Sequence, residues 1–515
     1  MKDLSPNALH VLKSRYLREG ETPYERFRSV AEHVASAEAP ARRVEFANKF
    51  FDVMSNLEFL PNTPCIANAG RDRGQLNACF VLPVADALST EEDDGIMDTA
   101  RNAALIHQSG GGTGFDFSRI RPMGAAVASS NGIASGPVSF LRLYDAVTET
   151  IKQGGIRRGA NMGILRVDHP DIGDFIRAKT DEHSLNNFNI SVAVTDAFME
   201  KVRDGDTLSR DLWSRIYNAA WLFGDPGLFF IDTANRDNPL GPDYPIRATN
   251  PCGEIPMPDW DACNLGSINL AAFVEGGQFD YFRFEQTVRL GIRFLDNVVS
   301  VNAVPVPGIQ AFTQQTRRLG LGIMGWADFL NELGVAYDSD EALLWVTRIG
   351  TVMRMVADST SEYLAAMRGS YPLSPDGLYR NVARLSIAPT GSISTIADCS
   401  PGIEPDFSAE YDRVVAIGTL REKKKHAESK TFRTAHDIDP AWHVRHQAAW
   451  QGYVDNGVSK TVNMRRESTP DDVRAVYELA FTLGCKGITI YRDGSRSEQV
   501  YRRIQCAIGA DGDCA

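Results

Sequence analysis

The first 60 residues alternate apolar and polar positions with the spacing of amphipathic helices. Apolar side chains recur at steps of three and four residues, as at Phe46, Phe50 and Val53. That spacing places them on one face of a helix with a period of 3.6 residues. The pattern stops at the Leu-Pro-Asn sequence of residues 60–62, where proline interrupts helical hydrogen bonding. The sequence therefore predicts a helical N-terminal subdomain over residues 1–60.

The pattern changes after that proline. From residue 61 to residue 496, glycine-rich turns alternate with short β-branched runs and amphipathic helical stretches, and no repeat or long linker divides them. Such alternation is typical of α/β architecture. We therefore predict an α/β domain over residues 61–496, followed by a flexible tail over residues 497–515 that is rich in Gly and Asp.

Composition and charge exclude several classes of protein. The chain has 515 residues with 54 basic and 66 acidic side chains, a net charge of −12. An acidic chain without a long basic block is not expected to bind nucleic acid. No stretch approaches the roughly 20 apolar residues that span a bilayer, and the N-terminus carries charge where a signal peptide is apolar. We expect a cytoplasmic protein with no membrane partner.

The eight cysteines are too sparse for a disulfide scaffold, and no two of them form a C-x-x-C pair. This pattern disfavours a structural zinc site and predicts no protein-bound metal. In a reducing compartment, a disulfide formed by such a chain is transient and catalytic. The cysteines are Cys65, Cys79, Cys252, Cys263, Cys399, Cys485, Cys506 and Cys514.

The segment NPCGEIP at residues 250–256 carries the most chemistry. Two prolines and a glycine exclude a helix, and in an extended chain alternate residues point to one side. Asn250, Cys252 and Glu254 are then expected to face a common space, where an amide, a thiol and a carboxylate can do general-base and redox chemistry. The alternative is a loop cysteine beside a turn Asn and a solvated Glu.

Two further cysteines begin or lie in runs with strand character. Cys79 starts the sequence CFVLPV, and Cys263 starts CNLGSINL. A buried cysteine in a strand is commonly a small hydrophobic residue. The spacing does not show whether these two cysteines form a pair.

Three glycine-containing loops are candidates for ligand binding. The sequence GGGTG at residues 110–114 lets the backbone approach a ligand closely, and Arg157 and Arg158 in GGIRRG suggest an anion. The sequence PTGSIST at residues 389–395 follows a strand-like run and offers backbone N–H groups to a phosphate at a helix start. An ordinary helix cap explains each of the last two loops equally well.

Seven ordered motifs together resemble one family, the catalytic subunit of ribonucleotide reductases, and in particular its adenosylcobalamin-dependent class II. The resemblance covers residues 57–496 and implies a ten-stranded α/β barrel with a central finger loop, preceded by the small helical subdomain. The motifs are NPCGE, CNLGSINL, GGGTGFDFSRIRP, GGIRRGANMG, RRLGLGIMGWADFL, APTGSIST and GCKGITIYRDGSR.

The resemblance implies a catalytic role for each of five residues. Cys252 is expected to carry the thiyl radical that removes the 3′ hydrogen of the ribose, Glu254 to act as the general base, and Asn250 to hold the hydroxyl groups. Cys79 and Cys263 are expected to deliver two electrons and close to a disulfide as the 2′-hydroxyl leaves as water. A dithiol suits that role because thiol–disulfide exchange can restore it.

The same resemblance implies binding sites and partners. The substrate phosphates are expected on a set of eight residues, a deoxynucleotide effector on Asp98, Arg157 and Arg158, and a thioredoxin-like protein or small dithiol as reductant, with Cys506 and Cys514 as the redox pair of the tail. Effector binding at a subunit interface implies a homodimer. The phosphate residues are Thr63, Ala78, Gly112, Thr390, Gly391, Ser392, Ile393 and Ser394.

The radical source distinguishes the reductase classes. Class I subunits carry adjacent tyrosines where this chain has Gly487 and Ile488, and no glycyl-radical loop is recognisable near the C-terminus. The resemblance therefore favours class II, with adenosylcobalamin as cofactor. It does not decide between ribonucleoside diphosphates and triphosphates as substrates, although a dimeric class II enzyme favours diphosphates. Three alternatives remain open at this stage: a class I enzyme with an unrecognised radical partner, a nucleotide-binding regulatory module without catalysis, and a plain thiol–disulfide oxidoreductase.

Overall fold

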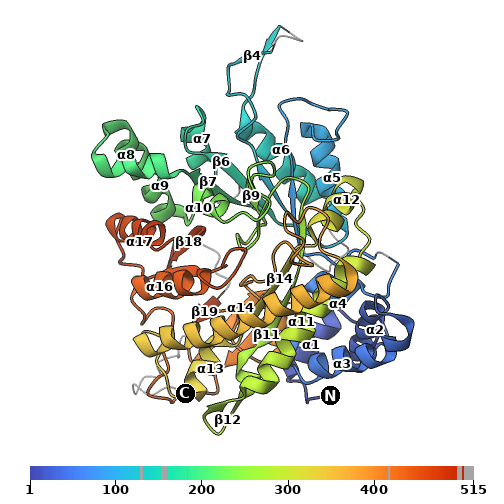
Figure 1. The fold of residues 1–515 in the computed structure, drawn as a ribbon. Coiled ribbons are helices and arrows are strands. Elements are labelled where there is room, and N and C mark those ends of the chain that lie inside the picture. Colours follow the sequence, from blue (N-terminus) through green and yellow to red (C-terminus); the bar gives the residue numbers. More distant parts are fainter. Residues whose placement is uncertain are drawn as a thin grey trace.

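Helices form the N-terminal part of the chain, as the apolar spacing predicts. A computed structural model describes residues 1–72, 74–127, 131–151, 159–181, 184–415, 418–495 and, for the backbone, 501–503. Ser5 and Thr22 cap the first two helices with their side chains, and a proline begins each helix. Figure 1 shows these helices in blue beside the body of the molecule: α1 (Pro6–Arg15), α2 (Pro23–Ala35) and α3 (Arg43–Ser55).

Five parallel strands form the first half of a barrel. Parallel neighbours need long crossover connections, which helices supply here. The strands are β2 (Cys79–Leu82), β3 (Gly112–Asp116), β6 (Asn161–Arg166), β7 (Phe188–Val194) and β8 (Gly227–Phe230). The helices that follow them are α5 (Ile96–Gln108), α6 (Pro137–Thr150), α7 (Ile172–Ile176), α8 (Asp196–Asp204), α9 (Thr207–Phe223) and α10 (Ile231–Arg236).

A second set of parallel strands completes the barrel. Isolated parallel bridges, Leu321 to Leu385 and Ile387 to Val458, connect β14 (Leu319–Met324) to the segment before β17 (Thr461–Met464). The remaining strands of this half are β11 (Ala262–Asn269) and β18 (Gly487–Arg492). Its helices are α11 (Tyr281–Val301), α12 (Pro307–Thr316), α13 (Trp326–Glu332), α14 (Asp340–Arg368), α16 (Pro440–Gln451) and α17 (Pro470–Thr482).

Two antiparallel contacts join the halves. β11 pairs with β2 and β18 pairs with β8, so the order of strands runs around the whole structure. Ten strands of the described residues share this mixed sheet, including β1 (Phe59–Pro61), which is antiparallel to β11. The expected α/β barrel with an N-terminal helical part is therefore confirmed.

A short hairpin lies against the inner face of the barrel. Its strands are β9 (Ala248–Thr249) and β10 (Pro256–Met257), and β9 contacts β2, β3 and β6. A Cβ atom added at Gly114 would lie 1.7 Å from the carbonyl oxygen of Thr249, and one at Gly112 would lie 2.8 Å from Pro251 Cγ. The glycines of this motif thus make room for the hairpin, where the sequence predicted a close approach to a ligand.

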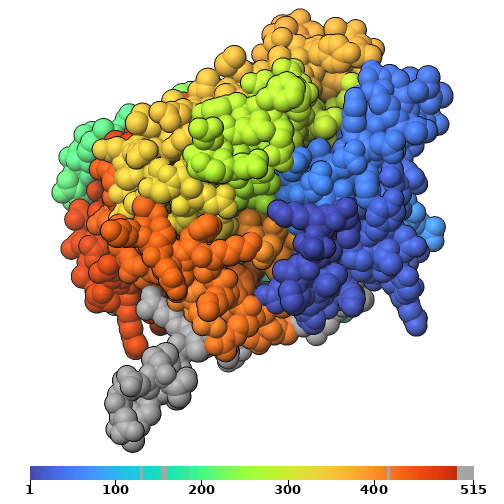
Figure 2. All heavy atoms as spheres, turned by 90° about the horizontal axis from the view of Figure 1, so that it is seen from below, coloured from blue at the N-terminus to red at the C-terminus, as the bar shows by residue number. Residues whose placement is uncertain are grey.

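The remaining elements lie around the barrel ends. On the face shown in Figure 2, the N-terminal segment in dark blue lies beside residues of the orange segment, and the Asn7 side-chain amide donates to the carbonyl oxygen of Arg421 at 2.8 Å. These elements are α4 (Thr63–Asn68), α15 (Gly391–Ala397), β4 (Ala126–Val127), β5 (Gly132–Ile133), β12 (Val274–Glu275), β13 (Gln278–Phe279), β15 (Glu410–Val415), β16 (Gly418–Lys423) and β19 (Tyr501–Arg503). None of the described helices is both long and apolar enough to span a bilayer.

Candidate active site

The tip of the hairpin between β9 and β10 is a tight turn, which the sequence did not predict. The N–H of Gly253 donates to the carbonyl oxygen of Asn250 at 3.0 Å, and Gly253 has a φ of +80°, a value that favours glycine. The extended conformation expected for this segment is therefore wrong. Asn250, Cys252 and Glu254 nevertheless line one cavity, because the turn brings them together in place of strand alternation.

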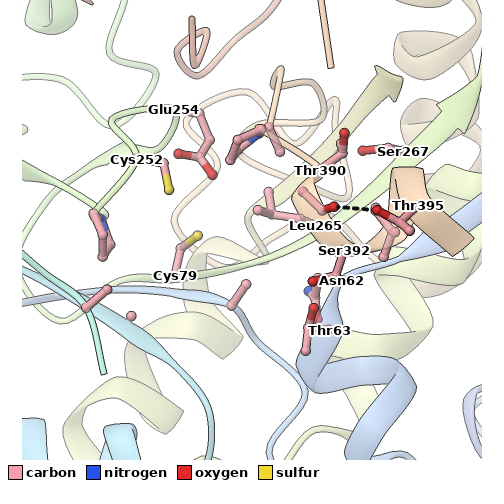
Figure 3. A pocket seen from close by; sticks show the side chains of 18 of the residues that line it. Asn62, Thr63, Cys79, Cys252, Glu254, Leu265, Ser267, Thr390, Ser392 and Thr395 are labelled. Atoms are coloured by element: carbon pink, nitrogen blue, oxygen red, sulfur yellow. Dashed lines mark hydrogen bonds between the residues drawn. The ribbon is translucent and has the colours of Figure 1, made fainter. Parts of the chain in front are cut away.

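That cavity has a volume of about 340 Å³, which lies in the range of small-ligand sites, roughly 300 to 1000 Å³. Figure 3 shows the thiols of Cys252 and Cys79 and the carboxylate of Glu254 gathered at one end, and Thr390 and Ser392 at the other. The thiols, the carboxylate and the hydroxyl-rich loop thus line the same cavity.

Asn250 links the carboxylate to one of the thiols. Its side-chain nitrogen donates to Glu254 Oε2 at 2.7 Å and to Cys79 Sγ at 3.1 Å. The N–H of Ile255 donates to Asn250 Oδ1 at 3.0 Å, which fixes the orientation of the amide. Asn250 and Glu254 are each 2% exposed, whereas Cys252 is the exposed one of the six cysteines that the structure describes. The Glu254 carboxylate is therefore held in place, and the Cys252 thiol is accessible.

Cys79 and Cys263 lie directly opposite each other on neighbouring antiparallel strands, β2 and β11. Residues opposite each other in such a pair have Cα atoms about 4.5–5.5 Å apart, within the range of about 4.4–6.8 Å seen in disulfides. Both are thiols in this structure and both are buried. The pairing that the sequence left open is thus geometrically possible, and the arrangement can supply two electrons beside the carboxylate and the exposed thiol.

The hydroxyl-rich loop forms the other end of the cavity. Thr390 has a φ of +53° and precedes α15, so the chain turns sharply from the bridge at Ile387 into the helix. Seven of the eight residues expected at the phosphates line the cavity: Thr63, Ala78, Gly112, Thr390, Gly391, Ser392 and Ile393. Ser394 lies on an adjacent cavity of about 330 Å³ on the other side of α15.

Two arginines at this end escaped prediction from sequence. Arg15 Nη1 donates to Ser392 Oγ at 2.9 Å, and Arg413 Nη2 donates to the carbonyl oxygen of Gly391 at 3.0 Å. Both line the cavity and bring positive charge to the loop. Arg15 comes from α1 and Arg413 from β15, so no local spacing in the sequence connects either of them to the loop.

Comparison with known families identifies the fold and the site together. The family described as "Ribonucleotide reductase, barrel domain" matches residues 77–209, 207–376 and 374–491, and "Ribonucleotide reductase, all-alpha domain" matches residues 2–74. The chain belongs to the ribonucleotide reductase family.

Several relatives of this reductase carry vitamin B12 in their names. This chain is 44% identical to a "Vitamin B12-dependent ribonucleoside-diphosphate reductase" of Thermoplasma acidophilum, in a match that covers 88% of this chain and 66% of that protein. A Mycobacterium tuberculosis protein of the same name is 41% identical over 96% of this chain and 80% of its own length. The chain thus spans about two thirds to four fifths of these relatives, and the resemblance to class II is confirmed.

A solved structure supports the fold of the reductase. The Actinobacillus ureae class Id ribonucleotide reductase alpha subunit superposes with a TM-score of 0.81 and 26% sequence identity, covering 95% of this chain and 97% of that one. The fold is therefore shared with a protein that is named as a class Id reductase subunit and carries no vitamin B12 in its name. The fold alone does not select the cofactor.

Asp98, the one residue of the expected effector site that the structure describes, is not among the residues that line the cavity. Asp98 stands in the first turn of α5, where it accepts hydrogen bonds from the Thr90 N–H and the Ser89 hydroxyl, both at 2.9 Å. The hydrogen bond from the Thr90 backbone is the main cause that lowers the pKa of Asp98. Four other residues named from the sequence lie outside the described residues: Arg157, Arg158, Cys506 and Cys514.

Three cysteines of the reductase lie outside this cavity. Burial raises the pKa of Cys65 and of Cys485 to about 12, so both thiols stay protonated near neutral pH. Burial also raises the pKa of Cys399 well above its usual value. None of the three lines the cavity or lies opposite a cysteine that does, so we assign them to packing.

Proposed function

We propose that this reductase converts ribonucleoside diphosphates to 2′-deoxyribonucleoside diphosphates through a thiyl radical on Cys252, with adenosylcobalamin as the radical source. The observation that carries the proposal is the cavity in which the exposed Cys252 thiol meets the buried Glu254 carboxylate and Cys79. The names of the relatives support the cofactor and the diphosphate substrate.

Each side chain of the cavity has a role in this chemistry. The Cys252 thiyl takes the 3′ hydrogen of the ribose, Glu254 accepts the proton of the 3′-hydroxyl, and Asn250 holds Glu254 in position. The 2′-hydroxyl leaves as water, and the thiols of Cys79 and Cys263 provide two electrons and two protons as they form a disulfide. Cys252 then returns the hydrogen to the 3′ carbon.

The surroundings of Cys252 fit a radical source that comes from outside the cavity. Its side chain is exposed at the cavity, so a cofactor that approaches from solvent can reach it. Adenosylcobalamin, when bound, supplies an organic radical able to take the thiol hydrogen. Cys252 is exposed whereas Cys79 and Cys263 are buried, so Cys252 is the thiol that such a radical reaches first.

The phosphates of the substrate are placed at the loop before α15, within reach of Arg15 and Arg413. We expect Arg15→Ala to raise the KM for a ribonucleoside diphosphate about tenfold, with a smaller effect on kcat, because a charge-assisted hydrogen bond to a phosphate is worth about 1.5–3 kcal/mol. Lys13→Ala, an exposed lysine on the same helix, is the control. Steady-state kinetics check the prediction, and an unchanged KM in Arg15→Ala would remove Arg15 from the substrate site.

The regulatory and assembly features of the resemblance belong to the same proposal. We assign a deoxynucleotide effector to the region of Asp98 and to the GGIRRG segment, and a homodimer to the face of α5, which exposes Met97 and Leu105. A thioredoxin-like protein or small dithiol reduces the Cys79–Cys263 disulfide through Cys506 and Cys514. The location is cytoplasmic, and the chain divides into segments 1–60, 61–496 and 497–515.

An anaerobic turnover assay tests the proposed function. The protein is incubated with a dithiol, a deoxynucleotide effector, and either a ribonucleoside diphosphate or the matching triphosphate, with and without adenosylcobalamin. We expect deoxynucleotide from the diphosphate only when the cofactor is present. Product without the cofactor would exclude the class II assignment, and product from the triphosphate alone would exclude the assigned substrate.

A further inference from the structure

The two thiols of the proposed redox pair differ in their access to the cavity. Cys79 lines the cavity, whereas Cys263 is not among the lining residues and is 0% exposed. A reductant that enters the cavity can therefore reach the sulfur of Cys79 before that of Cys263. A disulfide between them would therefore have one sulfur at the cavity wall and one behind it.

A buried arginine lies on the far side of Cys263. β11 and β14 run parallel with Asn264 opposite Leu319, which places Arg318, the preceding residue, beside Cys263. Arg318 is 2% exposed. Three neighbouring chain segments therefore place Cys263 between two other residues, with Cys79 on one side and Arg318 on the other.

The hydrogen bonds of Arg318 hold its guanidinium in this position. Nε donates to Asp261 Oδ2 at 2.6 Å and Nη1 donates to Asn456 Oδ1 at 3.0 Å. Nη2 is buried and has no hydrogen-bond partner among the described residues. The Nη2 amino group of a fixed, buried cation is thus available for an additional acceptor, which is unusual because buried polar groups are nearly always paired.

The electrostatic surroundings of Cys263 depend strongly on this arginine. Burial raises the pKa of the Cys263 thiol well above its usual value, and Arg318 is the largest influence in the opposite direction. The other charged groups that face Cys263 are Asp261 and Glu254, and both raise its pKa further. Arg318 is therefore the cation that can offset the cost of a negative charge on the buried sulfur.

We propose that Arg318 is a positioning residue for the reduction of the Cys79–Cys263 disulfide, in which the reducing dithiol attacks Cys79 and Arg318 stabilises the Cys263 thiolate that leaves. The inference rests on the proposed function, because it assumes that the two cysteines are the redox pair. It assigns different tasks to two sulfurs that the family resemblance treats as a pair.

The exchange proceeds in two balanced steps. A thiolate of the dithiol bonds to Cys79 Sγ, the Cys79–Cys263 bond breaks, and its electron pair stays on Cys263 as a thiolate. The second thiol of the reductant, as its thiolate, then attacks the mixed disulfide and releases Cys79 as a thiolate. Each protein sulfur takes up one proton, and the reductant leaves as a disulfide, oxidised by two electrons.

Loss of Arg318 also has a structural consequence that the test must separate from this role. Asn456, which Arg318 holds, precedes Gly457, whose N–H donates to the carbonyl oxygen of Glu254 at 2.7 Å. A substitution that disturbs this segment would affect Glu254 as well. The decisive measurement is therefore the rate of disulfide reduction itself, which does not require turnover.

The test uses the full-length protein with the pair oxidised by diamide and reduced by dithiothreitol. The rate of thiol–disulfide exchange rises with the stability of the leaving thiolate. We therefore expect dithiothreitol to reduce the disulfide of Arg318→Gln about tenfold more slowly than that of wild type, and the disulfide of Arg318→Lys at a rate within about threefold of wild type. Arg317→Gln, which removes the adjacent buried arginine paired with Asp296, is the control and is expected to keep the wild-type rate.

Two outcomes would overturn the role of Arg318: a wild-type rate in Arg318→Gln, or equal slowing in Arg318→Lys and Arg318→Gln, which indicates a structural effect. Should Arg318→Gln fail to fold, Arg318→Lys alone tests the role: it keeps a cation beside Cys263, and reduction more than about tenfold slower than wild type in this variant would contradict the proposal.

Access to the two sulfurs is tested separately in a Cys252→Ser background. With Cys263→Ser added, Cys79 is expected to react with 5,5′-dithiobis(2-nitrobenzoate), and with Cys79→Ser added, Cys263 is expected to react at least about 100-fold more slowly, because reaction rates follow thiol access. Equal rates would overturn the assignment of the attacked sulfur. If the wild-type protein formed no deoxynucleotide in the turnover assay, the proposed function would be overturned. The rates of disulfide reduction and of thiol reaction would still be measured, because neither requires turnover.

Discussion

Cys252→Ser is expected to abolish deoxynucleotide formation, with a loss of at least about 1000-fold in kcat, as is typical when the group that performs the central chemical step is removed. A serine O–H bond is stronger than a thiol S–H bond, so serine cannot take over the radical. The side chain is exposed, and surface substitutions usually change stability by less than about 0.5 kcal/mol. The measurement is anaerobic turnover together with the melting temperature.

The matched control is Cys399→Ser, a half-buried cysteine outside the cavity. We expect this variant to retain turnover, and we expect Cys252→Ser to bind the diphosphate with unchanged affinity in equilibrium dialysis. Turnover in Cys252→Ser above about 1% of wild type would show that another group carries the radical.

Gly114→Ala is expected to have the next largest effect, because a Cβ atom at this position would lie 1.7 Å from the carbonyl oxygen of Thr249. The hairpin that carries Cys252 must move away from β3 to admit it. A displacement of about 1 Å at a catalytic group can cost about 100-fold in rate, and overpacking costs about 1–3 kcal/mol of stability. Turnover and thermal unfolding measure the two effects.

Gly452→Ala provides the control for adding a methyl group to a glycine. Its Cβ would meet its nearest neighbour, the carbonyl oxygen of Ala449, at an ordinary 3.5 Å. Wild-type turnover is expected in this variant. If Gly114→Ala also turned over at the wild-type rate, the close fit between β3 and the hairpin would have no part in positioning Cys252.

Much of the local structure could be predicted from the sequence, because the spacing of apolar residues depends only on neighbouring positions in the chain. The spacing of Phe46 and Phe50 predicted helix, and the apolar runs at Cys79 and Cys263 predicted the strands β2 and β11. The site residues were found from the motifs that carry the family resemblance. Composition also indicated transient redox chemistry, which fits two thiols opposite each other in the sheet.

Contacts between residues far apart in the chain could not be predicted from the sequence. The register that sets Cys79 opposite Cys263 depends on strands 184 residues apart, and the contact of Arg15 with Ser392 spans 377 residues. The turn at Gly253 was missed for a different reason, since strand alternation was assumed where a hairpin end requires a glycine with positive φ. In each case the tertiary structure decided what the local pattern left open.

A single-turnover experiment tests the central claim most directly. The fully reduced protein, with Cys506 and Cys514 replaced by Ser so that the tail cannot reduce the pair again, is mixed anaerobically with adenosylcobalamin and a ribonucleoside diphosphate, without any external reductant. Both the deoxynucleotide and the cysteine peptides are then analysed by mass spectrometry. We predict about one deoxynucleotide for each chain, matched by one disulfide between Cys79 and Cys263, and neither in Cys252→Ser. Product formed while both thiols remain reduced, or formed equally without the cofactor, would contradict the account.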